Sequence, residues 1–341
     1  MKHINEIVNG SDYDFLRTNE RLGNNIIFLC YGGSHAYGTN NPSSDVDIRG
    51  CMFNKKSDLV GMSSYEQFIE NKTDTTVYCF NKLIELLCNC NPNTIEMLGN
   101  KPEHRLIYHP IGQQMIDKRK MFLSRKAANS FGGYANSQLR RLQNAVARDA
   151  LSQPQREEHM LLSIKNMMMS FDERYQQFDE GSIKLYIDKS DKEEFDSEIF
   201  MDINLTKFPL RDYKGMWAEM NEIIKVYGKL NHRNNKKDEM HLNKHAMHLI
   251  RLYLMALDIF EKEEIVTHRE ADLPLLMSIR NGEYMDDDGT YRAEFFEMVD
   301  DFEKRLEYAK DNSSLPTNPD YPAIEEFVMY VNEKVVKGEL F

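Results

Sequence analysis

The N-terminal part of the chain alternates short apolar runs with polar turns, a pattern typical of strands. The run from Ile26 to Cys30 is continuously apolar and lies between an Asn-Asn pair and a Gly-Gly pair, as a buried strand should. Gly50 indicates a bulge or bend in a later run. The predicted elements are strands over 25–31, 45–53 and 73–78 and a helix over 81–88.

Beyond about residue 110 the apolar positions recur at helical spacing. Helices are predicted over 112–130, 131–151, 155–178, 211–229, 239–262 and 293–311. The pattern over 181–208 is less regular and leaves a hairpin open. The predicted fold class is therefore α+β. Residues 1–112 combine short strands with helices, and a mainly helical domain follows over 113–341.

Composition narrows the class of protein. The chain has 341 residues, of which 41% are hydrophobic and 29% charged, so disordered and fibrous classes are excluded. The first residues lack an apolar signal segment, and no run approaches the roughly 20 apolar residues of a membrane span. The five cysteines lack CxxC spacing. We expect a cytoplasmic protein with reduced thiols and no membrane partner; the sequence does not indicate an oligomeric state.

Charge is spread unevenly along the chain. The segment from Asn281 to Phe341 holds 16 acidic and 6 basic residues, whereas Lys118 to Arg148 holds eight basic residues and no acid. Cations attract phosphates, and an aromatic ring can stack on a base. One interpretation is a nucleic-acid-binding surface made by Arg125, Lys126, Tyr134, Arg140 and Arg141. The other is a basic helix that pairs with the acidic C-terminal region.

One segment carries a pattern of catalytic chemistry. Gly33 and Ser34 follow the first strand, and Asp45 and Asp47 open the second. Alternation along a strand places the two carboxylates on one side, about 6–7 Å apart, where a divalent cation such as Mg²⁺ relieves their repulsion. The glycine bend and the Ser34 hydroxyl can donate to phosphate oxygens. The pattern predicts a nucleotidyl-transfer site; taken alone, Ser and Asp at these positions also suit an ordinary turn.

These residues resemble a known family. The glycine-serine and Asp-x-Asp pair resembles the polymerase-β-type nucleotidyltransferase superfamily, and the string GSHAYGTNNPSSDVDIRG is particularly similar to the predicted RNA-ligase-associated nucleotidyltransferases. Further similar segments are Asn91 to Leu98, Lys244 to Leu252 and Ile279 to Glu283. The resemblance implies that residues 1–112 form a catalytic nucleotidyltransferase domain, a small mixed β-sheet with flanking helices, and that the domain over 113–341 is mainly helical. It also implies metal-dependent transfer of NMP from an NTP, with Mg²⁺ or Mn²⁺ as cofactor.

The resemblance also implies a third carboxylate on a neighbouring strand. Asp74 is the first candidate and Glu70 the alternative. By analogy with the family, Asp45 and Asp47 hold two metal ions, and the third carboxylate serves the attacking hydroxyl. Arg49 either orients a carboxylate or phosphate or forms a structural salt bridge.

A basic stripe is predicted on the helix over 239–262. His241, Lys244, His245, His248 and Arg251 recur at spacings of three and four residues. A solvated basic face is one explanation of the stripe. A wall that faces phosphate is the other, with His245, His248 and Arg251 binding the nucleotide. Zinc is disfavoured because the helix lacks an HExxH pattern.

Together the observations favour a nucleotidyltransferase that moves an NMP from an NTP to an acceptor hydroxyl, with the 3′ end of an RNA such as tRNA as the candidate acceptor. Transfer to a protein side chain or a small molecule remains an alternative. So does a nucleotide-binding module without turnover, although the intact set of Gly33, Ser34, Asp45 and Asp47 disfavours it.

Overall fold

The computed structural model describes residues 3–149, 158, 161, 183–189, 197–233, 239–286 and 289–340. Two compact units emerge from the contacts. The first combines Met1–Arg140 with Asn243–Phe341, and the second is Arg141–Leu242. The first unit is therefore assembled from two stretches that a hundred intervening residues separate along the chain. The assignment of catalysis to residues 1–112 stays a prediction.

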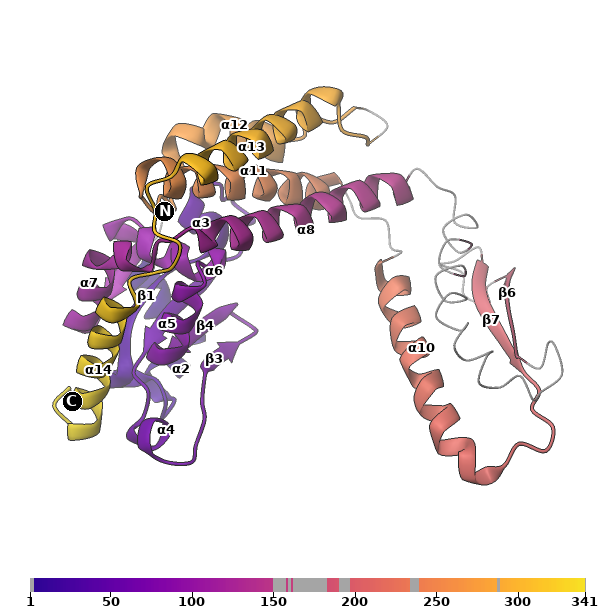
Figure 1. The fold of residues 1–341 in the computed structure, drawn as a ribbon, viewed down its shortest axis with the longest axis horizontal. Helices are drawn as coiled ribbons and strands as arrows, with labels where there is room; N and C mark the ends of the chain where they lie inside the picture. The colour runs from indigo at the N-terminus through magenta and orange to yellow at the C-terminus, as the bar shows by residue number, and fades with distance from the viewer. Residues whose placement is uncertain are drawn as a thin grey trace. The chain divides into compact units, whose positions relative to one another are not determined.

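A five-stranded mixed sheet forms the centre of the first unit (Figure 1). Its strands are β1 (Ile26–Tyr31), β2 (Ile48–Met52), β3 (Gln67–Glu70), β4 (Thr75–Cys79) and β5 (Arg105–Ile107). Their spatial order is β3-β4-β2-β1-β5. Strands β2 and β4 run parallel, and the other neighbours are antiparallel. The α+β fold class is confirmed.

The sheet differs from its prediction in three details. Strand β2 begins at Ile48, so the two aspartates precede it. The edge strands β3 and β5 were not predicted, because short half-exposed segments carry little periodicity. The register shift lies on β1 between Ile26 and Phe28, and Gly50 pairs regularly with Leu29.

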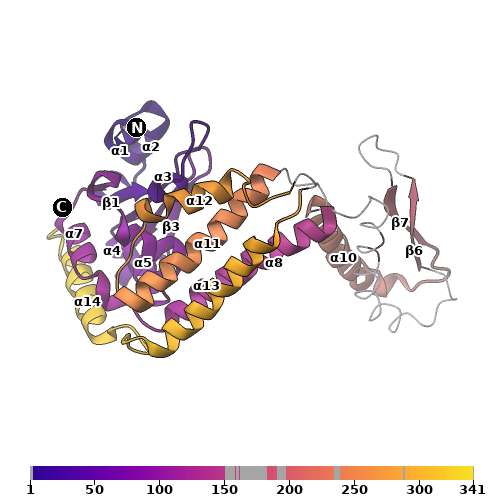
Figure 2. The same cartoon turned by 90° about the horizontal axis from the view of Figure 1, so that it is seen from above.

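Helices surround this sheet in the first unit. Those of the N-terminal stretch are α1 (Ile4–Val8), α2 (Phe15–Thr18), α3 (Gly33–Tyr37), α4 (Lys56–Val60), α5 (Phe80–Cys88), α6 (Pro92–Ile95) and α7 (Pro110–Asp117). The later ones are α12 (Leu273–Arg280), α13 (Ala293–Asn312) and α14 (Tyr321–Lys337), while α8 (Lys126–Asp149) and α11 (Glu239–Lys262) continue into the second unit. Figure 2 shows α11, α12 and α13 beside one another. Among the described helices, none combines the length and apolarity that crossing a membrane requires.

The predicted break between two helices at residues 130 and 131 is wrong. A single helix, α8, runs through this point, and the real interruption lies earlier, where α7 ends at Asp117 and a 3₁₀ turn covers Arg119–Phe122. The adjacent Gly132 and Gly133 suggested a junction, but a helix tolerates glycine at a modest cost.

The second unit contains a two-stranded antiparallel sheet of β6 (Ile183–Lys189) and β7 (Ser197–Ile203), followed by α10 (Tyr213–Arg233). The hairpin that the sequence left open is therefore present. The helix predicted over 155–178 lies outside the described residues, apart from positions 158 and 161.

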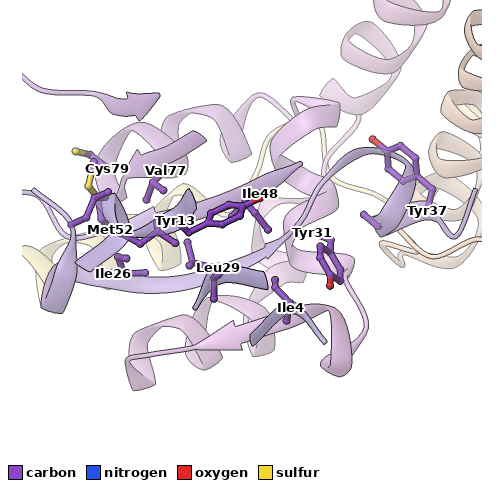
Figure 3. Packing of buried hydrophobic residues seen from close by; sticks show 14 residues of the cluster. Ile4, Tyr13, Ile26, Leu29, Tyr31, Tyr37, Ile48, Met52, Val77 and Cys79 are labelled. Carbon is purple, nitrogen blue, oxygen red and sulfur yellow. The ribbon is translucent and has the colours of Figure 1, made fainter. Parts of the chain in front are cut away.

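The core of the first unit ties the sheet to the N-terminal helices. Ile4 and Val8 of α1 pack in one cluster with Leu29, Ile48 and Val77 from three strands (Figure 3). Every residue of β1 is buried. Burial of apolar surface stabilises the folded state by about 25 cal/mol per Å². The buried core therefore holds the strands in place, and with them the polar residues that lie just beyond the strand ends.

Gly50 provides a test of this packing. A Cβ at Gly50 would lie 2.5 Å from Leu29 Cδ2 and 2.8 Å from the Phe28 carbonyl oxygen. We expect Gly50→Ala to lower the free energy of unfolding by about 1–3 kcal/mol through overpacking. Gly132→Ala is the control, since no atom lies within 4 Å of a Cβ there, and it should raise stability by about 0.5–1 kcal/mol. Urea unfolding measures both; equal stabilities would contradict the described packing.

Candidate functional site

Three strand ends meet at one edge of the sheet. Ile48 opens β2 and pairs with Thr75, which opens the parallel strand β4, while the antiparallel β1 ends at the same level. The Gly32 N–H donates to the Asp47 carbonyl at 2.8 Å, and the Ile48 N–H donates to the Asp74 carbonyl at 3.3 Å. Asp47 and Asp74 therefore lie side by side, each directly before its strand.

The glycine bend lies against Asp47. Gly33 has φ +54°, in the left-handed region, and begins the short helix α3. A Cβ at Gly33 would lie only 1.8 Å from Asp47 Oδ2, and one at Gly32 only 3.3 Å from Asp47 Cβ. Only glycine leaves room for this carboxylate, and Ser34 follows in the first turn of α3, partly buried.

Arg49 connects the two aspartates. Its Nη2 atom lies 3.1 Å from Asp74 Oδ1 and 3.9 Å from Asp47 Oδ1, and its Nη1 atom donates to the Asp74 carbonyl at 2.5 Å. Of the two candidates for a third carboxylate, Asp74 is the one beside Asp47. Glu70 instead accepts from the Lys72 N–H at 3.1 Å, within the turn between β3 and β4.

The pKa values of the two neighbouring carboxyls are shifted in opposite directions. Burial, reinforced by a hydrogen bond with Asp74, raises the pKa of Asp47 to about 7. The same hydrogen bond, with help from Arg49, lowers the pKa of Asp74. As the pH rises, Asp74 therefore ionises before Asp47.

The residues fit a divalent cation. Asp47 and Asp74 lie side by side before two parallel strands, and paired carboxylate oxygens are ligands that suit a divalent cation. The exposed Asp45 carboxylate, two residues before Asp47, forms no hydrogen bond or ion pair with a described residue. Within the ranges that the structure describes, no group of three or more His, Cys, Asp or Glu side chains is already arranged around a metal position.

The basic residues of helix α11 differ in how exposed their side chains are. Lys244 is exposed, and its charge lowers the pKa of both Asp47 and Asp74. His245 and His248 are partly buried. Arg251 is fully buried, with its guanidinium 3.1 Å from Glu96 and 3.7 Å from the centre of the Tyr37 ring. The structure thus does not bring Arg251 to the surface, because its helical position faces the core.

The candidate nucleic-acid-binding residues also differ, some being engaged in contacts within the first unit and others exposed. Arg125 donates to the Ser313 and Leu315 carbonyls, each at 3.0 Å, and Lys126 donates to the Tyr321 hydroxyl at 2.7 Å. These partners belong to the C-terminal region but are not its carboxylates. Tyr134 is exposed on α8. Arg140 and Arg141 lie further along the same helix, and their side chains are outside the described part of the chain.

Sequence reasoning missed Arg280. This residue ends α12 and donates to the Thr39 carbonyl and, at 3.4 Å, to the Ser44 hydroxyl. It therefore holds the loop between the glycine bend and Asp45. The similarity of Ile279 to Glu283 to family segments was the signal that could have identified it.

One known protein family matches part of the chain. Residues 9–172 match the RNA repair pathway DNA polymerase beta family, which confirms the resemblance seen in the sequence. The match contains the glycine bend and all three aspartates. No curated protein and no solved structure matches the chain.

The raised pKa of Asp47 predicts an unusual pH dependence of stability. A carboxyl with a folded pKa of about 7 and an ordinary value of 3.8 favours folding when protonated, so its contribution is lost as pH rises through 7. Asp47→Asn keeps a donor to Asp74 without the charge. We expect it to raise the free energy of unfolding more at pH 8 than at pH 5, measured by urea unfolding in EDTA.

Asp45→Asn is the matched control for this experiment. The Asp45 carboxylate is exposed, so its replacement should change stability by a similar small amount at both pH values. An Asp47→Asn effect that is equal at pH 5 and pH 8 would show that the pKa of Asp47 is not raised.

Proposed function

On the premise that residues 9–172 are of the polymerase beta type, we propose that this chain transfers an NMP from an NTP to an acceptor hydroxyl. The observation that supports the proposal most directly is the approach of Asp47 to the Gly32-Gly33 bend, with Asp74 beside it. Phosphate donors and cation ligands are thereby in one place. Neither feature is needed for an ordinary turn.

A divalent cation, Mg²⁺ or Mn²⁺, fits the carboxylates that gather where β2 and β4 begin. Asp45 and Asp47 would hold it, and when bound it supplies positive charge that neutralises the triphosphate. Loss of the Asp47 proton accompanies such binding, because a protonated carboxyl is a poor ligand.

The chain's own groups have complementary roles. The bend at Gly33 and the Ser34 hydroxyl donate to phosphate oxygens. Asp74, whose negative charge the Arg49 guanidinium stabilises at 3.1 Å, accepts the proton of the acceptor hydroxyl. Lys244, with His245 and His248, faces the negative charge of the triphosphate.

RNA is the acceptor that we favour. The name of the matched family refers to an RNA repair pathway, and an exposed Tyr134 lies on α8 within the acid-free stretch from Lys118 to Arg148. Arg125 is engaged with backbone carbonyls, so the proposed contacts to RNA depend on Lys126, Tyr134, Arg140 and Arg141. Transfer to a protein or a small molecule is the alternative that the assay below separates.

Labelling with α-³²P NTPs tests the reaction. The protein, Mg²⁺ and cellular RNA should give labelled RNA, and Asp45→Ala or Asp47→Ala should lower the rate at least about 10²–10³-fold. Asp12→Ala is the control, because Asp12 is exposed and its ion pair with Lys72, at 2.9 Å, lies on the surface. Label on protein or small molecules alone would favour the alternative acceptors, and no transfer with retained NTP binding would favour a binding module.

Salt dependence tests the RNA surface. Each phosphate contact to single-stranded RNA should contribute about 0.7 to the slope of log K against log salt. Arg140→Ala combined with Arg141→Ala should therefore reduce the slope by about 1.4, whereas Lys337→Ala, at the far end of α14, should leave it unchanged. Filter binding at several salt concentrations measures it, and a slope near zero for the wild type would remove this surface.

A further inference from the structure

A buried polar network joins four residues of the first unit. Glu96 accepts hydrogen bonds from the Tyr37 hydroxyl, at 2.9 Å to each carboxylate oxygen, and from Arg251 Nη1 at 3.1 Å. The Arg251 guanidinium stacks on the Tyr37 ring, and Thr267 donates to the Glu96 carbonyl at 2.6 Å. Helices α3 and α11 are thus attached to one carboxylate.

Arg251 has a further contact, with His248. Its Nη2 atom lies 3.2 Å from His248 Nδ1. A guanidinium has no acceptor and does not lose its proton in proteins, so Arg251 must donate in this hydrogen bond. His248 Nδ1 must therefore be unprotonated, and the ring is neutral with its proton on Nε2.

The surroundings of His248 agree with a neutral ring. Burial is the largest cause that places the pKa of His248 well below its usual value, and the charges of Arg251, His245 and Lys244 act in the same direction. His248 lies one helical turn after Lys244, on the same face of α11. On this face the Lys244 amine is the group whose positive charge lowers the pKa of Asp47 and of Asp74.

We propose that Arg251 is a positioning residue that fixes His248 in the Nε2–H tautomer, so that His248 presents a neutral hydrogen-bond donor to the triphosphate of the NTP. The nucleotide contact rests on the function proposed above; the fixed tautomer does not. A neutral donor orients the phosphate through a directional hydrogen bond and places no second positive charge beside Lys244. Arg251 itself stays in the core and does not touch the nucleotide.

Nitrogen NMR of the full chain with ¹⁵N-labelled histidine tests the tautomer without any nucleotide. We expect His248, assigned by its absence from His248→Gln, to show an unprotonated Nδ1 and a protonated Nε2 at pH 7. A protonated Nδ1, an imidazolium or a tautomer mixture would overturn the positioning role.

A double variant separates positioning from simple structural support. Arg251→Met alone leaves Glu96 as an unpaired buried charge, so it is combined with Glu96→Gln, which removes that charge. The double variant should fold, as judged by its circular dichroism, and His248 should then populate both tautomers. A folded double variant that retains the pure Nε2–H form would show that Arg251 does not set it.

Binding of non-hydrolysable α,β-methylene NTPs with Mg²⁺ tests the contact. His248→Ala should weaken binding about tenfold, and His248→Gln should stay within about threefold of wild type, because the glutamine amide keeps a donor near the Nε2 position. His3→Gln, at an exposed N-terminal histidine, is the control.

The outcomes distinguish the two proposals. If wild type binds, Asp47→Ala loses binding and His248→Ala binds normally, the His248 contact is wrong and the proposed function stands. If wild type binds none of the four analogues, the proposed function and the contact both fail, and the nitrogen spectra alone decide the role of Arg251.

Discussion

The parallel pairing of β2 with β4 is the constraint on which the site depends. Its register matches Ile48 with Thr75, so the residues just before them, Asp47 and Asp74, must be neighbours. Antiparallel β1 ends at the same edge and delivers Gly33 to the same place. A shift of this register by one residue would turn every side chain of β2 to the opposite face and expose its buried positions. Core packing therefore holds the two carboxyls next to each other.

The buried ion pair of Glu96 and Arg251 has a different role. Removing two charges from water is costly, and such pairs are weak evidence of stability by themselves. This pair joins residues 155 positions apart, and Tyr37 links it to the helix that follows the glycine bend. The pair thus specifies how α11 meets α3. Apolar residues of similar volume could fill that space, but they would not orient a histidine.

Those features of the fold that depend on residues close together in the sequence could be predicted from it. Strand β1, the nucleotidyltransferase motif and the hairpin of the second unit each depend on neighbouring residues, and all three are present in the structure or the family match. Edge strand β5 and the interior position of Arg251 were not predictable. Spacing shows that Lys244 and Arg251 share a helix face, but only tertiary packing decides that one end of that face is exposed and the other buried.

The same physics links stability to chemistry at this site. Burial that raises the pKa of Asp47 disfavours its ionised form, so the folded chain without a cation is less stable where the carboxylate is charged. A bound cation reverses this, because it stabilises the charged form that folding alone disfavours. Arg49 does not neutralise the Asp47 carboxylate in the same way. Its guanidinium lies 3.9 Å from Asp47 and forms its shorter ion pair, at 3.1 Å, with Asp74. Under the proposed function, cation binding would offset the cost of burying the Asp47 carboxylate.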